Sequence, residues 1–302
     1  MADAKISALA SHGTPVAADY VASVLDSGPT SKKLLLSDLR KYTSQSYTPG
    51  GRLTLESGVP VSTTDQTAKT TIYYTPYIHN LINLWDGTNW APTEFTEKTL
   101  ALGTITSAKP YDVFGYLSAG ALVLELLAWT SDTARATAVS LQDGRYCKSG
   151  DKTRLLLGTF YTASTTTTTD SENYRYLDNV YNRVSKQTSM ILSGAASNTY
   201  SSTTVRAWNA DTTARFHVVQ SLPSSVFMSM YFTATTSYAV GGFGVNSTTT
   251  ASGLIVNPIA NWSATLGQTR SISAGYSYIA LLQYAYATAD FSYPLLIGQI
   301  QC

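Results

Sequence analysis

Short turn motifs between apolar runs predict much of the local structure of this chain. The apolar run 81–85 leads directly into Asp86-Gly87, and a further aromatic residue, Trp90, follows the turn. Asp-Gly in such a position predicts a β-hairpin, because both residues tolerate a positive φ. Two more motifs have the same character, namely Asp143-Gly144 and Ser118-Ala119-Gly120. Turns of this kind predict antiparallel strands that are neighbours in sequence.

Strand-like residue patterns continue along the rest of the chain. From Thr43 onward, β-branched and aromatic residues recur with a period of two, as in 52–55 and 71–75. No helix of ordinary length is expected after Tyr42. In the last third, strands are expected over residues 203–208, 213–220, 225–235, 237–245, 270–274, 276–286 and 296–301.

We therefore predict an all-β protein. A short N-terminal docking arm precedes two antiparallel β domains of the sandwich, jelly-roll or small-barrel type. The expected bounds are 1–42 for the arm, 43–164 for the first β domain, 165–185 for a linker and 186–302 for an outward-facing C-terminal β domain.

The charge content argues against two classes of partner. Only 13% of the residues are charged, against about 25% in an ordinary soluble domain, and 20 Lys and Arg balance 19 Asp and Glu. No basic cluster longer than Lys32-Lys33 is present, so nucleic-acid binding is not expected. The longest strongly apolar stretch, 121–129, contains Glu125 and is too short to span a bilayer, so membrane insertion is not expected either. The first residues do not resemble a signal peptide, which predicts a protein made in the cytoplasm.

Metal and cofactor motifs are missing from the sequence. His12, His79 and His217 lie far apart, and no glycine-rich phosphate loop is present. No cofactor and no metal site are therefore expected. Cys147 is interpreted as a small buried apolar residue, and no disulfide between Cys147 and Cys302 is expected.

Carboxylates are the only catalytic groups in reasonable supply. A polysaccharide-cleaving enzyme needs a pair of them facing a sugar, and the candidates are Asp86, Glu94, Glu97, Asp112 and Glu125. Each also has an ordinary structural explanation in a turn or at a strand edge. No catalytic residue is assigned, and the chain is predicted not to be an enzyme.

Aromatic residues supply the candidate contact surfaces. Trp85 and Trp90 flank the Asp86-Gly87 turn, where they form either a cross-strand pair or a surface for a sugar or a partner. In the last domain, phenols alternate with small residues and are expected on one strand face. They suit either an oligomer interface or a hydrogen-bonding ligand surface, and the residues are Tyr276, Tyr278, Tyr284 and Tyr286.

The N-terminal arm carries scattered apolar residues without a closed pattern. We interpret it as a segment that completes its fold against a partner. The residues predicted to anchor it are Ile6, Leu9, Lys32, Lys33, Leu34, Leu36 and Leu39.

Two sets of segments resemble proteins of tailed bacteriophages. Lys5-Ile6-Ser7-Ala8-Leu9, together with 30–34 and 36–40, resembles the N-terminal attachment segment of phage fibre and appendage proteins. A longer set is similar to a domain that recurs in phage virion proteins, often labelled tail or fibre proteins. It comprises residues 71–77, 84–90, 100–104, 111–114, 128–129, 135–137 and 141–144.

This resemblance covers roughly the first 185 residues and implies a structural role in a virion. It implies a homotrimer, anchored to other virion proteins by its N-terminus and exposed on the outside of the particle. The C-terminal domain would then face outward and bind host-surface polysaccharide. Two alternatives remain open: a capsid decoration or head-fibre protein, and a polysaccharide-degrading tailspike.

Overall fold

The computed structural model describes residues 20–23, 32–35, 48–191, 197–235, 238–256 and 262–302. Over these ranges the chain folds into strands β1 to β26 and one 3₁₀ helix, η2 (Trp208–Ala210), so the prediction of an all-β protein is confirmed. Among the same residues no helix is long and apolar enough to cross a membrane. Nearly all neighbouring strands run antiparallel, and the sheets stay open.

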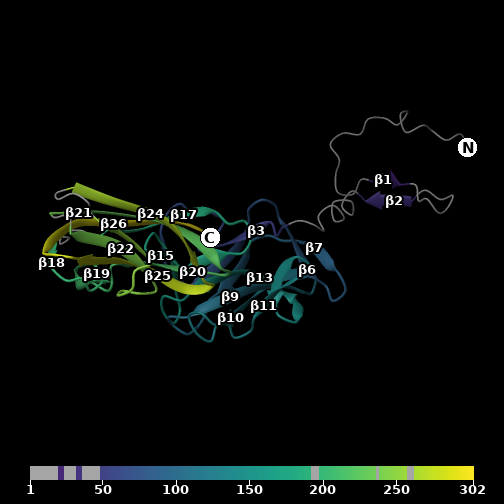
Figure 1. The fold of residues 1–302 in the computed structure, drawn as a ribbon. Coiled ribbons are helices and arrows are strands. Elements are labelled where there is room, and N and C mark those ends of the chain that lie inside the picture. The colour runs from purple at the N-terminus through teal and green to yellow at the C-terminus, as the bar shows by residue number, and fades with distance from the viewer. Residues whose placement is uncertain (1–19, 24–31, 36–47, 192–196, 236–237, 257–261) are drawn as a thin grey trace, which may run out of the picture.

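Two sheets pack face to face in the C-terminal half of the chain, residues 186–302 (Figure 1). The five-stranded sheet consists of β17 (Ser185–Ile191), β26 (Ala289–Gln301), β21 (Ser224–Ala234), β24 (Trp262–Ile272) and β18 (Asn198–Tyr200). The eight-stranded sheet contains, among others, β23 (Gly253–Val256), β22 (Ala239–Val245), β25 (Gly275–Ala285), β20 (Arg215–Gln220) and β19 (Arg206–Ala207).

Alternating side chains of these two sheets build the larger core. Along β21, Met228, Met230 and Phe232 are buried, whereas Phe227 before them and Tyr231 between them are exposed. Phe216 and Leu281 face this core from the eight-stranded sheet. Burial of one face only is the property of a sandwich sheet.

The N-terminal half, residues 48–185, has its own core around Leu53, Ile72, Val113 and Phe160. Its six-stranded sheet consists of β10 (Ala121–Ala128), β9 (Pro110–Ser118), β13 (Asp151–Tyr161), β12 (Arg145–Lys148), β11 (Val139–Gln142) and β16 (Leu177–Asn179). Smaller units beside it are β3 (Gly51–Thr54), β5 (Thr71–Pro76) and β8 (Lys98–Ala101), and the pair β6 (Leu81–Trp85) and β7 (Trp90–Glu94). A separate two-stranded sheet, β1 (Tyr20–Ser23) and β2 (Lys32–Leu35), comes earlier in the chain.

The predicted hairpin turns are confirmed. Trp85 pairs with Trp90 across the first turn, where Gly87 has φ 106°. The Asp86 carboxylate accepts hydrogen bonds from the backbone N–H groups of Thr88 and Asn89. The other two turns place Ala119-Gly120 and Asp143-Gly144 at positive φ, as two-residue hairpins require.

The eight-stranded sheet extends beyond the C-terminal half. Next to β20 it continues through β15 (Tyr174–Arg175), β14 (Thr168–Asp170) and β4 (Gln66–Lys69). Thr168 and Asp170 are buried, so this part of the predicted linker 165–185 belongs to the sheet. The domain bounds stay a prediction, but strands from both halves share this sheet.

Two arginines of the N-terminal half, each paired with a buried carboxylate of the same half, also donate hydrogen bonds to the C-terminal half. Arg135 binds the buried Asp112 at 2.7 Å, and it donates a further hydrogen bond to the backbone oxygen of Ser221. Arg183 binds the buried Asp178 at 2.9 Å and also donates to Gln220 at 2.8 Å. We call these two groups the ionic clasps.

One strand prediction is wrong in large part. The strand expected over 203–208 is limited to Arg206–Ala207 in β19, and η2 follows at once. The reason is Trp208, whose ring is fully buried against Phe232 and Phe291. Asn209 and Ala210 then take positive φ, which a strand does not allow. Cys147 and Cys302 are both buried free thiols, as expected.

Candidate functional site

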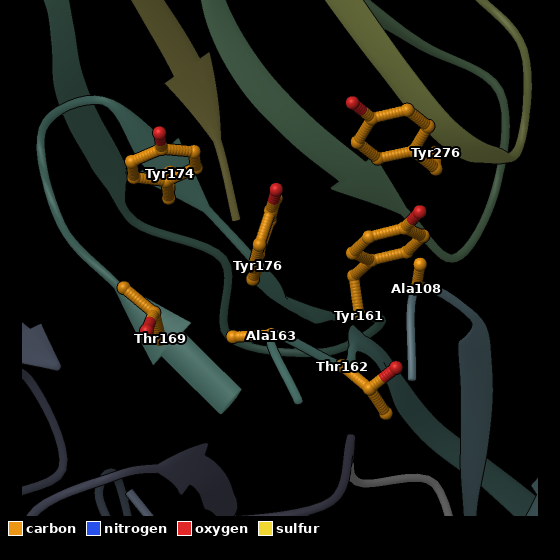
Figure 2. A pocket seen from close by; sticks show the side chains of 8 residues that line it. All are labelled: Ala108, Tyr161, Thr162, Ala163, Thr169, Tyr174, Tyr176 and Tyr276. Atoms are coloured by element: carbon orange, nitrogen blue, oxygen red, sulfur yellow. The ribbon is translucent and has the colours of Figure 1, made fainter. Parts of the chain in front are cut away.

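An open pocket of about 370 Å³ lies where the two halves meet (Figure 2). Tyrosine, threonine and alanine line it, and we call it the tyrosine pocket; its residues are Ala108, Tyr161, Thr162, Ala163, Thr169, Tyr174, Tyr176 and Tyr276. Small-molecule pockets in proteins have volumes of about 300–1,000 Å³. The tyrosine pocket therefore has room for a small ligand.

Segments that are distant in sequence position the rings. Tyr161 is the last residue of β13, and Tyr174 is the first residue of β15. Tyr276 lies near the start of β25, paired with Val219 of β20. Because β15 pairs in parallel with β20, Tyr174 stands opposite His217. The pocket therefore depends on the sheet that both halves share.

The rings form one continuous cluster. Tyr161 and Tyr276 are stacked, with ring centroids 4.3 Å apart. Tyr174 stacks on His217 at 4.8 Å. Tyr176 lies between them, 4.9 Å from Tyr161 and 5.4 Å from Tyr174, as Figure 2 shows. Such packing holds the rings rigidly.

Some polar groups of the pocket are already engaged. The Tyr276 hydroxyl lies 2.6 Å from Nδ1 of His217. The Thr162 hydroxyl accepts a hydrogen bond from the Lys109 backbone N–H and donates to the Thr106 carbonyl oxygen. The Thr169 hydroxyl accepts from the Ala68 backbone N–H at 3.3 Å, which leaves its own proton for another acceptor.

Two hydroxyls are available. Those of Tyr174 and Tyr176 form no hydrogen bond to any residue that the structure describes, although both side chains line the pocket. Tyr176 is only 7% exposed. The hydroxyl oxygen itself still reaches solvent, so it can form a hydrogen bond to a molecule that enters the pocket.

The pocket is electrically neutral at pH 7. Burial raises the pKa of Tyr161 and Tyr176 and raises that of Tyr276 to about 12, so these phenols keep their protons. Burial, with a smaller effect from the Arg215 charge, lowers the pKa of His217 to about 4. Asp132 lies next to Tyr161, whose hydroxyl donates a hydrogen bond to the Asp132 carboxylate. Burial raises the pKa of this carboxylate.

This arrangement suits a ligand that combines an apolar face with hydroxyl groups. The rings offer flat apolar surface, and the hydroxyls offer donors and acceptors without charge.

The structure separates the four tyrosines that the sequence grouped together. Tyr276, Tyr278 and Tyr284 do share one face of β25, and Tyr286 follows its end, but only Tyr276 lines the tyrosine pocket. Tyr278 is covered by the Arg215 guanidinium, 4.4 Å from the ring centroid. Tyr284 and Tyr286 form an edge-to-face pair near the other end of β25, with their hydroxyls 3.2 Å apart. Tyr286 is 60% exposed.

Trp85 and Trp90 form the cross-strand contact that was one of their two interpretations. Their ring centroids lie 5.6 Å apart. Lys152 lies over Trp85 and Arg145 over Trp90, and the Trp90 indole N–H donates to Asp143. The pair therefore packs against the hairpin formed by β11 and β12, and its ligand role stays a prediction.

The predicted anchor residues are only partly described. Lys32, Lys33 and Leu34 lie on β2, whereas Ile6, Leu9, Leu36 and Leu39 lie outside the described residues.

Sequence reasoning missed most of the pocket. It assigned a role to Tyr276 but none to Tyr161, Tyr174 or Tyr176. The alternation in Tyr174-Arg175-Tyr176 is a local signal that both rings share a face, which the structure bears out. No local pattern points to Tyr161, because its neighbour Tyr276 is distant in sequence.

Four of the candidate catalytic carboxylates have structural partners. Asp112 binds Arg135, and Glu125 binds Arg154. Glu97 accepts hydrogen bonds from Ser57, Gly58 and Thr75, and Asp86 closes its turn. Over the described ranges, no three His, Cys, Asp or Glu residues gather in a way that could hold a metal ion.

Comparisons with known proteins give no family. No family model matches the chain, and no curated protein matches it. Among solved structures, the insecticidal delta-endotoxin Cry8Ea1 from Bacillus thuringiensis is 8% identical with a TM-score of 0.28, covering 78% of this chain and 49% of the toxin. A Cry1Da tryptic core variant from the same organism is 9% identical with a TM-score of 0.23, covering 76% and 48%.

An exo-beta-1,3-galactanase from Phanerochaete chrysosporium, solved with galactose, is 12% identical with a TM-score of 0.23, covering 83% of this chain and 70% of the enzyme. The chain spans about half the length of the two toxins. Likenesses this distant carry no conclusion about function.

Proposed function

We propose that this chain is a non-enzymatic structural protein of a tailed bacteriophage particle. In this proposal it is a tail fibre or tail appendage, anchored to other virion proteins by residues 1–42. It assembles as a homotrimer on the outside of the particle and binds a host-surface glycan.

The observation that carries the binding role is the tyrosine pocket. Its lining combines aromatic rings with hydroxyl groups, and protein surfaces that recognise polar ligands often use this combination. The rings are fixed by stacking and by the His217 contact, so the pocket exists before a ligand arrives. The resemblance of the first 185 residues to phage virion proteins supports the rest of the proposal.

Immunogold electron microscopy of intact particles tests the proposal. Antibodies against residues 186–302 should label the tail or its fibres. Label spread over the head would make the chain a capsid appendage instead. Particles that carry no label, although the antibody recognises the purified chain, would overturn the structural role.

A second experiment tests the binding role. Purified chain should bind host cells, and polysaccharide extracted from those cells should compete for this binding. Release of reducing sugar ends during the incubation would contradict the non-enzymatic assignment.

A further inference from the structure

We propose that the tyrosine pocket binds one neutral pyranose ring of a glycan, with Tyr174 as its apolar platform and the Tyr176 and Thr169 hydroxyls as hydrogen-bond partners. The inference rests on the proposed function for the origin of the sugar. It adds the site, the class of sugar and the residues that recognise it.

The stacking geometry selects Tyr174 as the platform. Tyr161 and Tyr276 cover each other, so each has one face occupied. Tyr174 has one face on His217, yet 41% of the residue remains exposed. The apolar C–H face of a pyranose packs on such a ring, and the phenol hydroxyl stays free at its edge.

The two hydroxyls beside this ring complement the hydroxyls of a sugar. Tyr176 is buried and lacks a partner among the described residues. Thr169 is also buried and keeps its proton for donation, because its oxygen accepts from Ala68. A purely apolar ligand would leave both groups without a hydrogen bond, and that loss disfavours it.

The charges near the pocket favour a neutral sugar over an acidic one. None of the lining residues carries a positive charge that could pair with a carboxylate. The Arg215 guanidinium lies over Tyr278, which is not a lining residue, and its charge affects the pKa of Tyr176 and Tyr276 less than burial does. The Asp132 carboxylate, next to Tyr161, would repel a uronic or sialic acid. A buried anion without a partner is costly.

The experiment uses saturation-transfer NMR on the full chain. The probes are the methyl glycosides of glucose, galactose, mannose and N-acetylglucosamine, together with methyl glucuronide as the acidic counterpart. At least one neutral glycoside should bind, and its affinity should exceed that of the glucuronide.

Two variants test the named residues. Tyr174→Ala removes an exposed ring and should weaken the affinity about tenfold or more, and Tyr176→Phe removes one hydroxyl and should weaken it about fivefold. The matched controls are Tyr238→Ala, which also removes an exposed ring, and Tyr286→Phe, which removes a hydroxyl near the far end of β25. Both controls should leave the affinity unchanged.

The outcomes separate this inference from the proposed function. The inference is overturned if no neutral glycoside binds, or if the glucuronide binds with the same affinity as the neutral glycosides. It is also overturned if Tyr174→Ala and Tyr176→Phe bind with wild-type affinity. Each of these results counts whatever immunogold labelling shows. If the glycoside binds through Tyr174 but antibodies label no particle, the site stands and the phage role fails.

Discussion

The carboxylate of Asp178, on β16 in the N-terminal half, accepts a hydrogen bond at 2.6 Å from the backbone N–H of Ser221, which follows β20. Arg183 binds both oxygens of the same carboxylate, at 2.9 and 3.1 Å. The Asp178 side chain is fully buried. The hydrogen bond from Ser221 to this carboxylate joins the two halves, and Arg183, held by the same carboxylate, adds a second link through Gln220.

Asp178→Asn should destabilise the protein by about 3 kcal/mol, because Arg183 would keep its charge in a partly buried site without a counter-ion. Urea denaturation measures the change. Glu125→Gln is the matched control, since the Glu125–Arg154 pair is more exposed, and it should cost less than about 1 kcal/mol. Equal losses of unfolding free energy in the two variants would show that the buried Asp178–Arg183 pair stabilises the protein no more than an exposed ion pair does.

Gly87→Val should destabilise the hairpin of β6 and β7. Gly87 has φ 106°, and no atom lies within 4 Å of the position that a Cβ would take. The cost is therefore backbone strain alone, about 1–3 kcal/mol. Thermal unfolding measures it, with the neighbouring exposed change Thr88→Val as the control. An unaltered melting temperature for Gly87→Val would contradict the strain argument.

Stability should fall as the pH drops from about 6.5 to about 4, because of His217. Burial is the main cause that lowers its pKa in the fold to about 4, from an ordinary value of 6.5. The unfolded chain then takes up a proton at a higher pH than the folded chain, so acid favours unfolding. Between pH 6.5 and pH 4, His217 should lower the free energy of unfolding by about 3 kcal/mol in total.

Urea titrations at several pH values measure this dependence. His217→Gln, which cannot take up the proton, should flatten the profile between pH 6.5 and 4. An identical slope in wild type and variant would assign the acid sensitivity to other groups.

The sequence predicts the hairpins well and the pocket poorly, for a physical reason. Turns such as Ala119-Gly120 and Asp143-Gly144 depend on the φ preferences of two adjacent residues, so a local pattern is sufficient. Burial of Thr168 in the threonine run depends on its pairing with Lys69, which no local pattern encodes. The Tyr161–Tyr276 stack is long-range in the same way.

Deleting residues 1–42 should abolish incorporation of the chain into particles and leave the β core folded. In the proposed function these residues make the contact to other virion proteins. Western blots of purified particles measure incorporation, and near-ultraviolet circular dichroism of the purified variant checks the fold. Normal incorporation of a folded variant would contradict the anchoring role.

Because strands β4, β14 and β15 extend the eight-stranded sheet, the two halves are not interchangeable modules. A chimera that joined only residues 186–302 to another carrier would leave three of the four pocket tyrosines behind and expose the edge of β20. Recombination between related genes would preserve the pocket where the crossover falls before β4 or after β25, but not between them.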